Sequence, residues 1–271
     1  MLGAIIGDIV GSLFEFGENK ETAHSKKYPF ISKYSHYTDD TVMTLAIADA
    51  LMTAMPQKGL EISEFENCVI KSMRCFGEKY PDAGYGMKFY DWLFSEQEPV
   101  PYNSYGNGSA MRVSPVAWAF DNLEDVEKFA AASARVTHNH TEGIKGAQAT
   151  AAAIFLARTG KSKSEIKSYI CEKYHYDLTR TLDEIRPGYE HIEICQKTVP
   201  EAITAFLEGE NFEDVVRSAV SLSGDTDTLA AIAGSIAEGF YGIPDEITEM
   251  ALPKLDDFLS STLNRWEQWR S

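Results

Sequence analysis

Two short acidic clusters hold the residues best suited to chemistry in this chain. Residues 38–41 read TDDT, and residues 224–228 read GDTDT. Each cluster directly precedes an apolar segment with helical spacing. Helix capping explains part of the pattern, because hydroxyls cap a first turn and carboxylates favour its positive end. Capping requires neither two carboxylates beside two hydroxyls nor the same arrangement twice, so the repeated pattern indicates a second purpose.

The surroundings of the two clusters indicate a site for divalent cations. Small apolar residues line both of the helices that follow, which predicts that these helices are buried and closely packed. Buried carboxylates are costly unless they are paired or bound to a cation, and four aspartates brought together repel one another. Carboxylate and hydroxyl oxygens suit Mg²⁺ or Mn²⁺ better than zinc. We therefore interpret the clusters as the two halves of a binuclear metal site.

The N-terminal segment supplies a third group of candidates. Gly3, Gly7 and Gly11 recur every four residues and give one smooth helix face, which is typical of close helix packing. Packing does not explain Asp8 and Glu15, which lie seven residues apart and share a face if the helix continues that far. Glu15 falls where this helix is expected to end, which makes its side chain a candidate for a site.

Two further segments are candidates for binding a ligand. Residues 105–112 read YGNGSAMR, and a glycine-rich turn that opens into a short helix can present backbone N–H groups to a phosphate. Residues 137–140 read THNH and precede another helix. These two histidines could ligate a metal, cap that helix or hydrogen-bond a ligand. Because the hard oxygen ligands lie elsewhere, we favour the last two roles.

Helical periodicity dominates the elements that must position these groups. After Asp40, apolar residues follow at spacings of three and four as far as Ala54, and a cleaner stripe runs from Leu229 to Phe240. Further helices are predicted at residues 61–79, 123–136, 147–157, 164–173, 196–208, 212–222 and 253–269. Strand-like stretches such as 192–195 are short, and loops such as 55–59 join the helices. The sequence predicts an all-α protein with a single domain over residues 1–271.

The composition argues against several classes of protein. A net charge of −16 over 271 residues should repel nucleic-acid phosphate, and no basic stripe opposes it. We expect no membrane span and a cytoplasmic location, since no apolar run is long enough and the apolar start lacks a basic leader and a cleavage site. An anionic substrate would need local positive charge from metal ions or helix N-termini. We expect a monomer, because the small-residue helices look intramolecular.

The cysteines do not predict a disulfide framework, because they are few and form no C-x-x-C pair. They are Cys68, Cys75, Cys171 and Cys195. We expect free, mostly buried thiols in a reducing compartment. Cys68 and Cys75 lie seven apart on one face of a predicted helix, which favours the core for both.

Taken together, the five segments resemble the ADP-ribosylglycohydrolase family, which includes the dinitrogenase-reductase-activating glycohydrolase and the animal ADP-ribosyl-acceptor hydrolases. The matching motifs follow one another through nearly the whole chain, at residues 7–15, 38–41, 106–112, 137–138 and 224–228. The resemblance implies an orthogonal bundle of many helices with two divalent cations, Mg²⁺ or Mn²⁺, at the bottom of a cleft. It implies hydrolysis of the glycosidic bond between ADP-ribose and an acceptor, in an ADP-ribosylated protein or a related ADP-ribose conjugate.

The resemblance also implies roles for single residues. The implied metal ligands are Thr38, Asp39, Asp40, Asp225, Asp227 and Thr228. The implied substrate contacts are Gly106, Asn107, Gly108, Ser109, Met111 and His138. The resemblance also implies a catalytic role for Glu15. For the reaction itself, we expect Glu15, Asp39 or Asp40 to act as general base.

Other functions stay open at this point. A phosphoesterase or a pyrophosphatase for ADP-ribose-like nucleotides would use the same carboxylates but release phosphate or AMP. A protein that senses ADP-ribose without cleaving it would share most of the binding residues. A crystallin-like structural protein would have no need of the acidic clusters. The acceptor is equally open: arginine, serine, a nucleic-acid base, poly(ADP-ribose) or O-acetyl-ADP-ribose.

Overall fold

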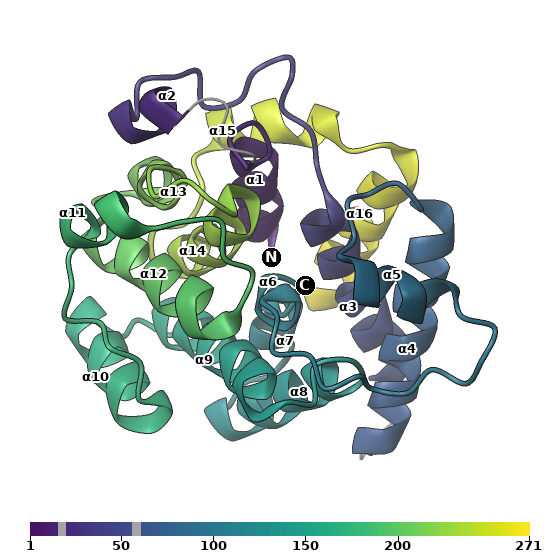
Figure 1. Ribbon diagram of the computed structural model, residues 1–271. Helices are drawn as coiled ribbons and strands as arrows, with labels where there is room; N and C mark the ends of the chain where they lie inside the picture. The colour runs from purple at the N-terminus through teal and green to yellow at the C-terminus, as the bar shows by residue number, and fades with distance from the viewer. Residues whose placement is uncertain (16–19, 56–60) are drawn as a thin grey trace.

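Helices joined by loops make up the part of the chain that the structure describes, as predicted. A computed structural model describes residues 1–15, 20–55 and 61–271 (Figure 1). Its α-helices are α1 (Leu2–Gly11), α2 (Lys20–Ser25), α3 (Asp39–Ala54), α4 (Ile62–Lys79), α5 (Met87–Phe94), α6 (Gly108–Met111), α7 (Ser114–Ala119), α8 (Leu123–Arg135), α9 (Thr141–Arg158), α10 (Lys163–Tyr174), α11 (Leu182–Ile185), α12 (Cys195–Glu208), α13 (Phe212–Val220), α14 (Thr226–Tyr241), α15 (Asp245–Ala251) and α16 (Asp257–Arg270). The 3₁₀ turns are η1 (Arg186–Gly188) and η2 (Leu252–Lys254). Within the described ranges, no helix is both long enough and apolar enough to cross a membrane.

Most of the predicted helices are confirmed, and the two acidic clusters open α3 and α14 as expected. The helix predicted at residues 253–269 is confirmed from residue 257 onward, but its predicted start is wrong. The 3₁₀ turn η2 comes first, and the next residue is extended. Helix α16 begins only where Asp256 accepts hydrogen bonds from the backbone N–H groups of Phe258 and Leu259. A side-chain cap therefore decides where this helix starts.

Other predictions met mixed outcomes. The strand-like stretch 192–195 supplies one isolated antiparallel bridge, and all but the first residue of the predicted loop 55–59 lies outside the described residues.

All four cysteines are free. The expectation of mostly buried thiols is wrong, because only Cys195 is buried, whereas Cys68 is half-buried and Cys75 is exposed. The buried face of α4 is formed by its larger apolar side chains, which turns Cys75 toward solvent.

Helix α14 lies at the centre of the fold. Every residue from Thr226 to Ala237 is buried, and the helix packs against α1, α9, α12 and α13 (Figure 1). The glycine face of α1 lies directly on α14. A Cβ at Gly7 would lie 2.1 Å from the carbonyl oxygen of Ala230, and a Cβ at Gly11 would be equally obstructed. The close packing predicted from the glycine spacing is therefore confirmed.

Helix α3 is, like α14, largely buried. It packs against α4, α7 and α16, and it also contacts α1. Because α1 touches both α3 and α14, it brings their N-terminal turns to the same place in the molecule. The two acidic clusters therefore meet, although more than 180 residues separate them in the sequence.

Candidate active site

A buried carboxylate from α1 holds the N-terminus of α3. Asp8 accepts hydrogen bonds from the N–H and the Oγ1 of Thr38 at 2.9 and 2.8 Å. It also accepts from the N–H of Thr41 at 3.0 Å and from the hydroxyl of that residue. Thr38 in turn caps α3 by accepting from the N–H of Asp40. A threonine therefore does the capping, and the carboxylates of Asp39 and Asp40 are left for another purpose.

A sharp turn leads into the N-terminus of α14. Gly224 has a φ of +77°, and a Cβ there would lie 2.6 Å from a neighbouring carbonyl oxygen, so the turn requires glycine. Asp225 occupies the N-cap position, but its side chain makes no capping hydrogen bond. Its Oδ2 instead accepts from Nδ2 of Asn107 at 2.5 Å. The hydroxyl of Thr226 donates to the carbonyl oxygen of Gly11 at 2.8 Å, which ties this turn to α1.

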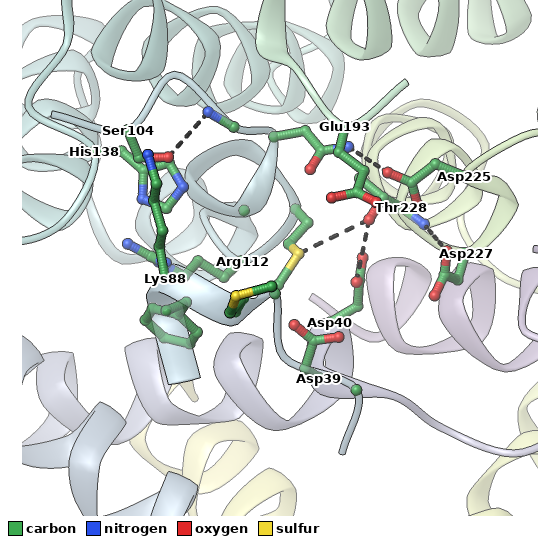
Figure 2. Close-up of a pocket in the computed structure, with 18 of the residues that line it drawn as sticks. Asp39, Asp40, Lys88, Ser104, Arg112, His138, Glu193, Asp225, Asp227 and Thr228 are labelled. Atoms are coloured by element: carbon green, nitrogen blue, oxygen red, sulfur yellow. Dashed lines mark hydrogen bonds between the residues drawn. The ribbon is translucent and has the colours of Figure 1, made fainter. Parts of the chain in front are cut away.

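Direct contacts join the two acidic clusters. The hydroxyl of Thr228 donates to Oδ2 of Asp40 at 3.2 Å, across 188 positions in the sequence. Oγ1 of Thr38 lies 3.4 Å from Oδ2 of Asp227. Figure 2 shows that acidic side chains of both clusters face one cavity. The structure thus brings together all six residues that the sequence suggests as metal ligands.

The clustered carboxylates are buried without cationic partners. Asp40, Asp225 and Asp227 are each at most 5% exposed, and Asp39 is half-buried. No ion pair in the described part of the chain includes any of the four. Burial, together with the charge of Asp227, raises the pKa values of Asp39, Asp40 and Asp225 well above their ordinary range. The ionised forms of these groups need a counter-charge.

The chemistry of the donor set fits hard divalent cations. Oδ1 of Asp40 is buried and has no hydrogen-bond partner among the described residues. The candidate ligands offer carboxylate and hydroxyl oxygens, which Mg²⁺ and Mn²⁺ prefer. As placed, no three acidic, histidine or cysteine side chains of the described residues stand ready around one ion position. The hydroxyls of Thr38 and Thr228 add two oxygen donors to the carboxylates.

Glu15 reaches the same cavity from the end of α1. The helix ends at Gly11 and a turn follows, so Asp8 and Glu15 do not share a helix face as a longer helix would require. Glu15 is half-buried and lines the cavity beside the acidic clusters. Burial and then the charge of Asp227 raise the pKa of Glu15 to about 7. A carboxyl group that titrates near neutrality is suited to exchange a proton with a reacting group.

A cavity of about 530 Å³ connects the acidic clusters to the glycine-rich segment. This volume is within the usual range for sites that bind small molecules. The acidic side chains gather on one side of it, and Arg112, Lys88 and His138 lie on the other (Figure 2). The suggested substrate contacts that line the cavity are Gly106, Asn107, Gly108, Met111 and His138.

Two suggested site residues do not line this cavity. Ser109 is fully buried, and its Oγ donates to the carbonyl oxygen of Gly143 at 2.8 Å and lies 3.7 Å from Sγ of Cys195. Its side chain therefore points into the core, where it cannot contact a ligand in the cavity. Thr38 is also buried, and Asp8 and the first turn of α3 engage its hydroxyl. If Thr38 binds a metal ion, its hydroxyl would do so from behind the residues that line the cavity.

Arg112 ends the glycine-rich motif, and its role at the site could not be predicted from the sequence. It lines the cavity, and its Nη2 donates to Oγ1 of Thr137 at 2.8 Å. Its guanidinium lies 5.6 Å from the ring centroid of Phe89. Burial lowers the pKa of Arg112 only to about 10, so it stays cationic at neutral pH. Burial and the charge of Arg112 lower the pKa of His138 well below its ordinary value, so this histidine is neutral there.

Other residues at the site carried little or no signal in the sequence. Asp8 stood in the glycine segment without an assigned task, and only its contacts with α3 reveal that it positions the acidic cluster. Lys88, Tyr102 and Glu193 line the cavity. These three come from loops and from α5, and no spacing pattern links them to the acidic clusters.

Comparison with known proteins points to one family. A family model described as ADP-ribosylglycohydrolase matches residues 1–268. The human protein named ADP-ribosylhydrolase ARH3 is 28% identical, over 92% of this chain and 86% of that protein. ADP-ribosylarginine hydrolase Tri1 of Pseudomonas putida is also 28% identical, over 90% of this chain and 70% of that protein. A solved structure described as an ADP-ribosylglycohydrolase-related protein complex has a TM-score of 0.67 at 22% identity, over 100% of this chain and 96% of that one, which shows the same fold.

Proposed function

The chain belongs to the ADP-ribosylglycohydrolase family, and we propose that it hydrolyses the glycosidic bond between ADP-ribose and an acceptor, with release of ADP-ribose. Relatives named as ADP-ribosylhydrolases support this activity. The proposed substrate is an ADP-ribosylated protein or a related ADP-ribose conjugate. The acidic part of the cavity then receives the ribose that carries the acceptor.

One observation carries the proposal: two acidic helix N-termini, Glu15 and a glycine-rich segment meet in one cavity. Cleavage of a glycosidic bond passes through an oxocarbenium-like transition state and needs a carboxyl group near the anomeric carbon. It also needs a surface that holds the nucleotide away from the reacting carbon. The acidic and basic sides of this cavity provide both parts.

The basic side of the cavity is suited to the diphosphate of ADP-ribose. A chain with a net charge of −16 repels an anionic ligand unless local groups oppose that charge. Arg112 provides a buried cation, and Lys88 adds a second one at the cavity wall. Gly106 and Gly108 line the cavity beside His138. These groups can hold the diphosphate without any contact from the acidic clusters.

We propose that two divalent cations, Mg²⁺ or Mn²⁺, belong to the acidic side. Their ligands would be Thr38, Asp39, Asp40, Asp225, Asp227 and Thr228. Bound there, such ions supply positive charge for the ribose hydroxyls and lower the pKa of a bound water. The protein's own contribution is position: Asp8 fixes the start of α3, and the contact of Thr226 with Gly11 fixes the start of α14.

Glu15 is the residue we assign as general base. It lines the cavity beside the acidic clusters, and in the cation-free protein burial and the charge of Asp227 raise its pKa to about 7. Asp39 and Asp40 are alternative proton acceptors, but a carboxylate that binds a cation is a weaker base. Glu15 would therefore take a proton from the attacking water as the water oxygen bonds to the anomeric carbon. The bond from that carbon to the acceptor breaks in the same reaction, and the acceptor leaves with the bonding electron pair and takes up a proton, which Glu15 can return.

The activity can be tested with peptides that carry ADP-ribose on arginine or on serine. Each peptide is incubated with the protein and Mg²⁺ or Mn²⁺, and the products are followed by mass spectrometry. The controls are the same reactions with EDTA and with the Asp225→Asn variant. We expect intact ADP-ribose from at least one linkage, and its loss in both controls.

The other outcomes separate the competing functions. Release of AMP would assign the chain to pyrophosphate cleavage instead. Binding of ADP-ribose without any product would favour a sensor. Release of ADP-ribose that is unaffected by EDTA would keep the glycosidase and remove the cations from the proposal.

A further inference from the structure

Thr198, on the buried face of α12, makes contact with the acidic site through one intermediate residue. Its hydroxyl accepts from Nδ2 of Asn107 at 3.1 Å, and the same Nδ2 donates to Oδ2 of Asp225 at 2.5 Å. We propose that Thr198 is a positioning residue for Asp225, acting through the side-chain amide of Asn107. This inference rests on the proposed function, because it concerns a suggested cation ligand of that site.

The carbonyl oxygen of Ile192 determines which group donates in each hydrogen bond between Thr198, Asn107 and Asp225. The hydroxyl of Thr198 donates its only proton to the carbonyl oxygen of Ile192 at 3.1 Å. It can therefore only accept from Asn107, so the amide nitrogen and not the amide oxygen must face it. An amide nitrogen has two protons, and the second one is left for Asp225. The hydroxyl of Thr198 thus donates to Ile192, and the amide of Asn107 donates both to Thr198 and to Asp225.

Because these three side chains are buried, a wrong orientation of the amide costs free energy. Thr198 is fully buried, Asn107 is 6% exposed and Asp225 is 5% exposed, so water cannot readily replace a missing partner. A rotated amide would place its oxygen against a carboxylate and against lone pairs of the hydroxyl, which is unfavourable at both contacts. The hydroxyl of Thr198 therefore selects the amide orientation that keeps Asp225 in place.

The backbone around Asn107 is held by the same segment that carries Thr198. The N–H of Asn107 donates to the carbonyl oxygen of Glu193 at 3.0 Å. The N–H of Cys195 donates to the carbonyl oxygen of Tyr105 at 3.0 Å, beside the isolated bridge. Backbone and side chain of Asn107 are thus both fixed by residues 192–198.

The test compares cation binding rather than turnover. The protein is freed of metal with EDTA and desalted, and Mn²⁺ is titrated into it by calorimetry, with thermal unfolding measured with and without Mn²⁺. The variants are Thr198→Val, which removes the hydroxyl, and Thr198→Ser, which keeps it. The matched control is Thr204→Val in the same helix. The hydroxyl of Thr204 donates to the carbonyl oxygen of Pro200 at 2.9 Å, within its own helix backbone.

We expect Thr198→Val to raise the Kd for Mn²⁺ by about 10- to 100-fold, as loss of a partner that orients a metal ligand usually does. Thr198→Ser and Thr204→Val should keep the Kd of the natural protein. If Thr198→Val does not fold, Thr198→Ala removes the same hydroxyl with a smaller side chain.

Two results would overturn the inference in different ways. An unchanged Kd in Thr198→Val, with a lower Tm in the absence of Mn²⁺, would show that Thr198 supports only the packing of α12. Absence of Mn²⁺ binding by the natural protein would remove the proposed cation site, and the positioning role with it. The first result leaves the proposed cation site intact, whereas the second removes that site and leaves the hydrolysis of ADP-ribose conjugates to be tested by product release.

Discussion

At the scale of single residues, the carboxylates at the start of α3 and α14 are the groups whose burial costs the most free energy. Asp40 and Asp225 are buried among other acids, and the protein supplies neither with an ion-pair partner in its described part. Burying a charge without compensation costs several kcal/mol, which a folded protein accepts only where the charge has a use. The acids are therefore expected to lower stability and to serve function.

This expectation can be tested with Asp225→Asn. The amide keeps the shape of the side chain but removes a negative charge that a cation would need. We expect release of ADP-ribose to fall by at least about 100-fold, since even partners behind metal ligands change metal affinity or activity 10- to 100-fold. In EDTA, the Tm should stay the same or rise. Normal turnover by this variant would remove Asp225 from the metal site.

Glu15 offers a test that separates proton transfer from cation binding. Glu15→Gln keeps the size of the side chain but cannot accept a proton. We expect kcat to fall by about 100- to 10,000-fold, the usual contribution of a general base. The rise in Tm on addition of Mn²⁺ should be unchanged, because Glu15 is not among the proposed ligands. A loss of that rise would make Glu15 a cation ligand instead.

At the scale of elements, α1 is the part that connects the two halves of the site. Asp8 holds α3, while the glycine face lies so close to α14 that a Cβ at Gly7 would lie 2.1 Å from a carbonyl oxygen. Nothing larger than hydrogen fits there unless the helices separate. Such a separation would move Asp8 and the start of α3 away from α14, so packing and site geometry are coupled.

We therefore expect Gly7→Ala to lower the free energy of unfolding by about 1–3 kcal/mol, the usual cost of overpacking a core. Activity should fall as well, because α3 and α14 would be forced apart. Gly188→Ala is the matched control, since a Cβ there meets nothing within 4 Å. Its effect should stay within about 0.5 kcal/mol. Chemical denaturation measures both variants, and equal stability would contradict the tight α1–α14 contact.

At the scale of the whole molecule, the buried acids couple stability to pH. Burial raises the pKa of Asp8 to about 7, and it raises those of Asp39, Asp40 and Asp225 well above the ordinary 3.8. Between about pH 4 and pH 7 the folded protein then binds more protons at these groups than the unfolded chain does. Their contribution to stability is present below pH 4 and is lost as the pH rises.

In EDTA, the stability of the natural protein should therefore decline between pH 5 and pH 8 more steeply than that of Asp225→Asn. The difference between the two slopes should be at most about 1.4 kcal/mol per pH unit, which corresponds to one proton. Mn²⁺ should reduce the decline, since a cation favours the ionised carboxylates. Urea denaturation at several pH values measures this difference. Parallel slopes would show that Asp225 does not titrate as its burial implies.

Features that depend on neighbouring positions in the chain could be predicted from the sequence. The helices follow from apolar spacing, the acidic clusters were placed at the starts of two buried helices, and the glycine face of α1 was assigned to packing. The same local order carries the motifs of the family, which is why the resemblance pointed to the all-α fold. These predictions succeeded because capping, periodicity and close packing are set by residues within one or two turns of each other.

Directions of side chains could not be predicted in this way, and only the tertiary structure decided them. Ser109 and Asn107 stand two positions apart in one motif, yet one points into the core and the other toward Asp225. Cys75 faces solvent although its spacing favoured the core. Arg112 and Thr198 gained their roles from partners on other elements. The physical reason is that a side chain's environment is made by distant segments, whose arrangement depends on how the helices pack.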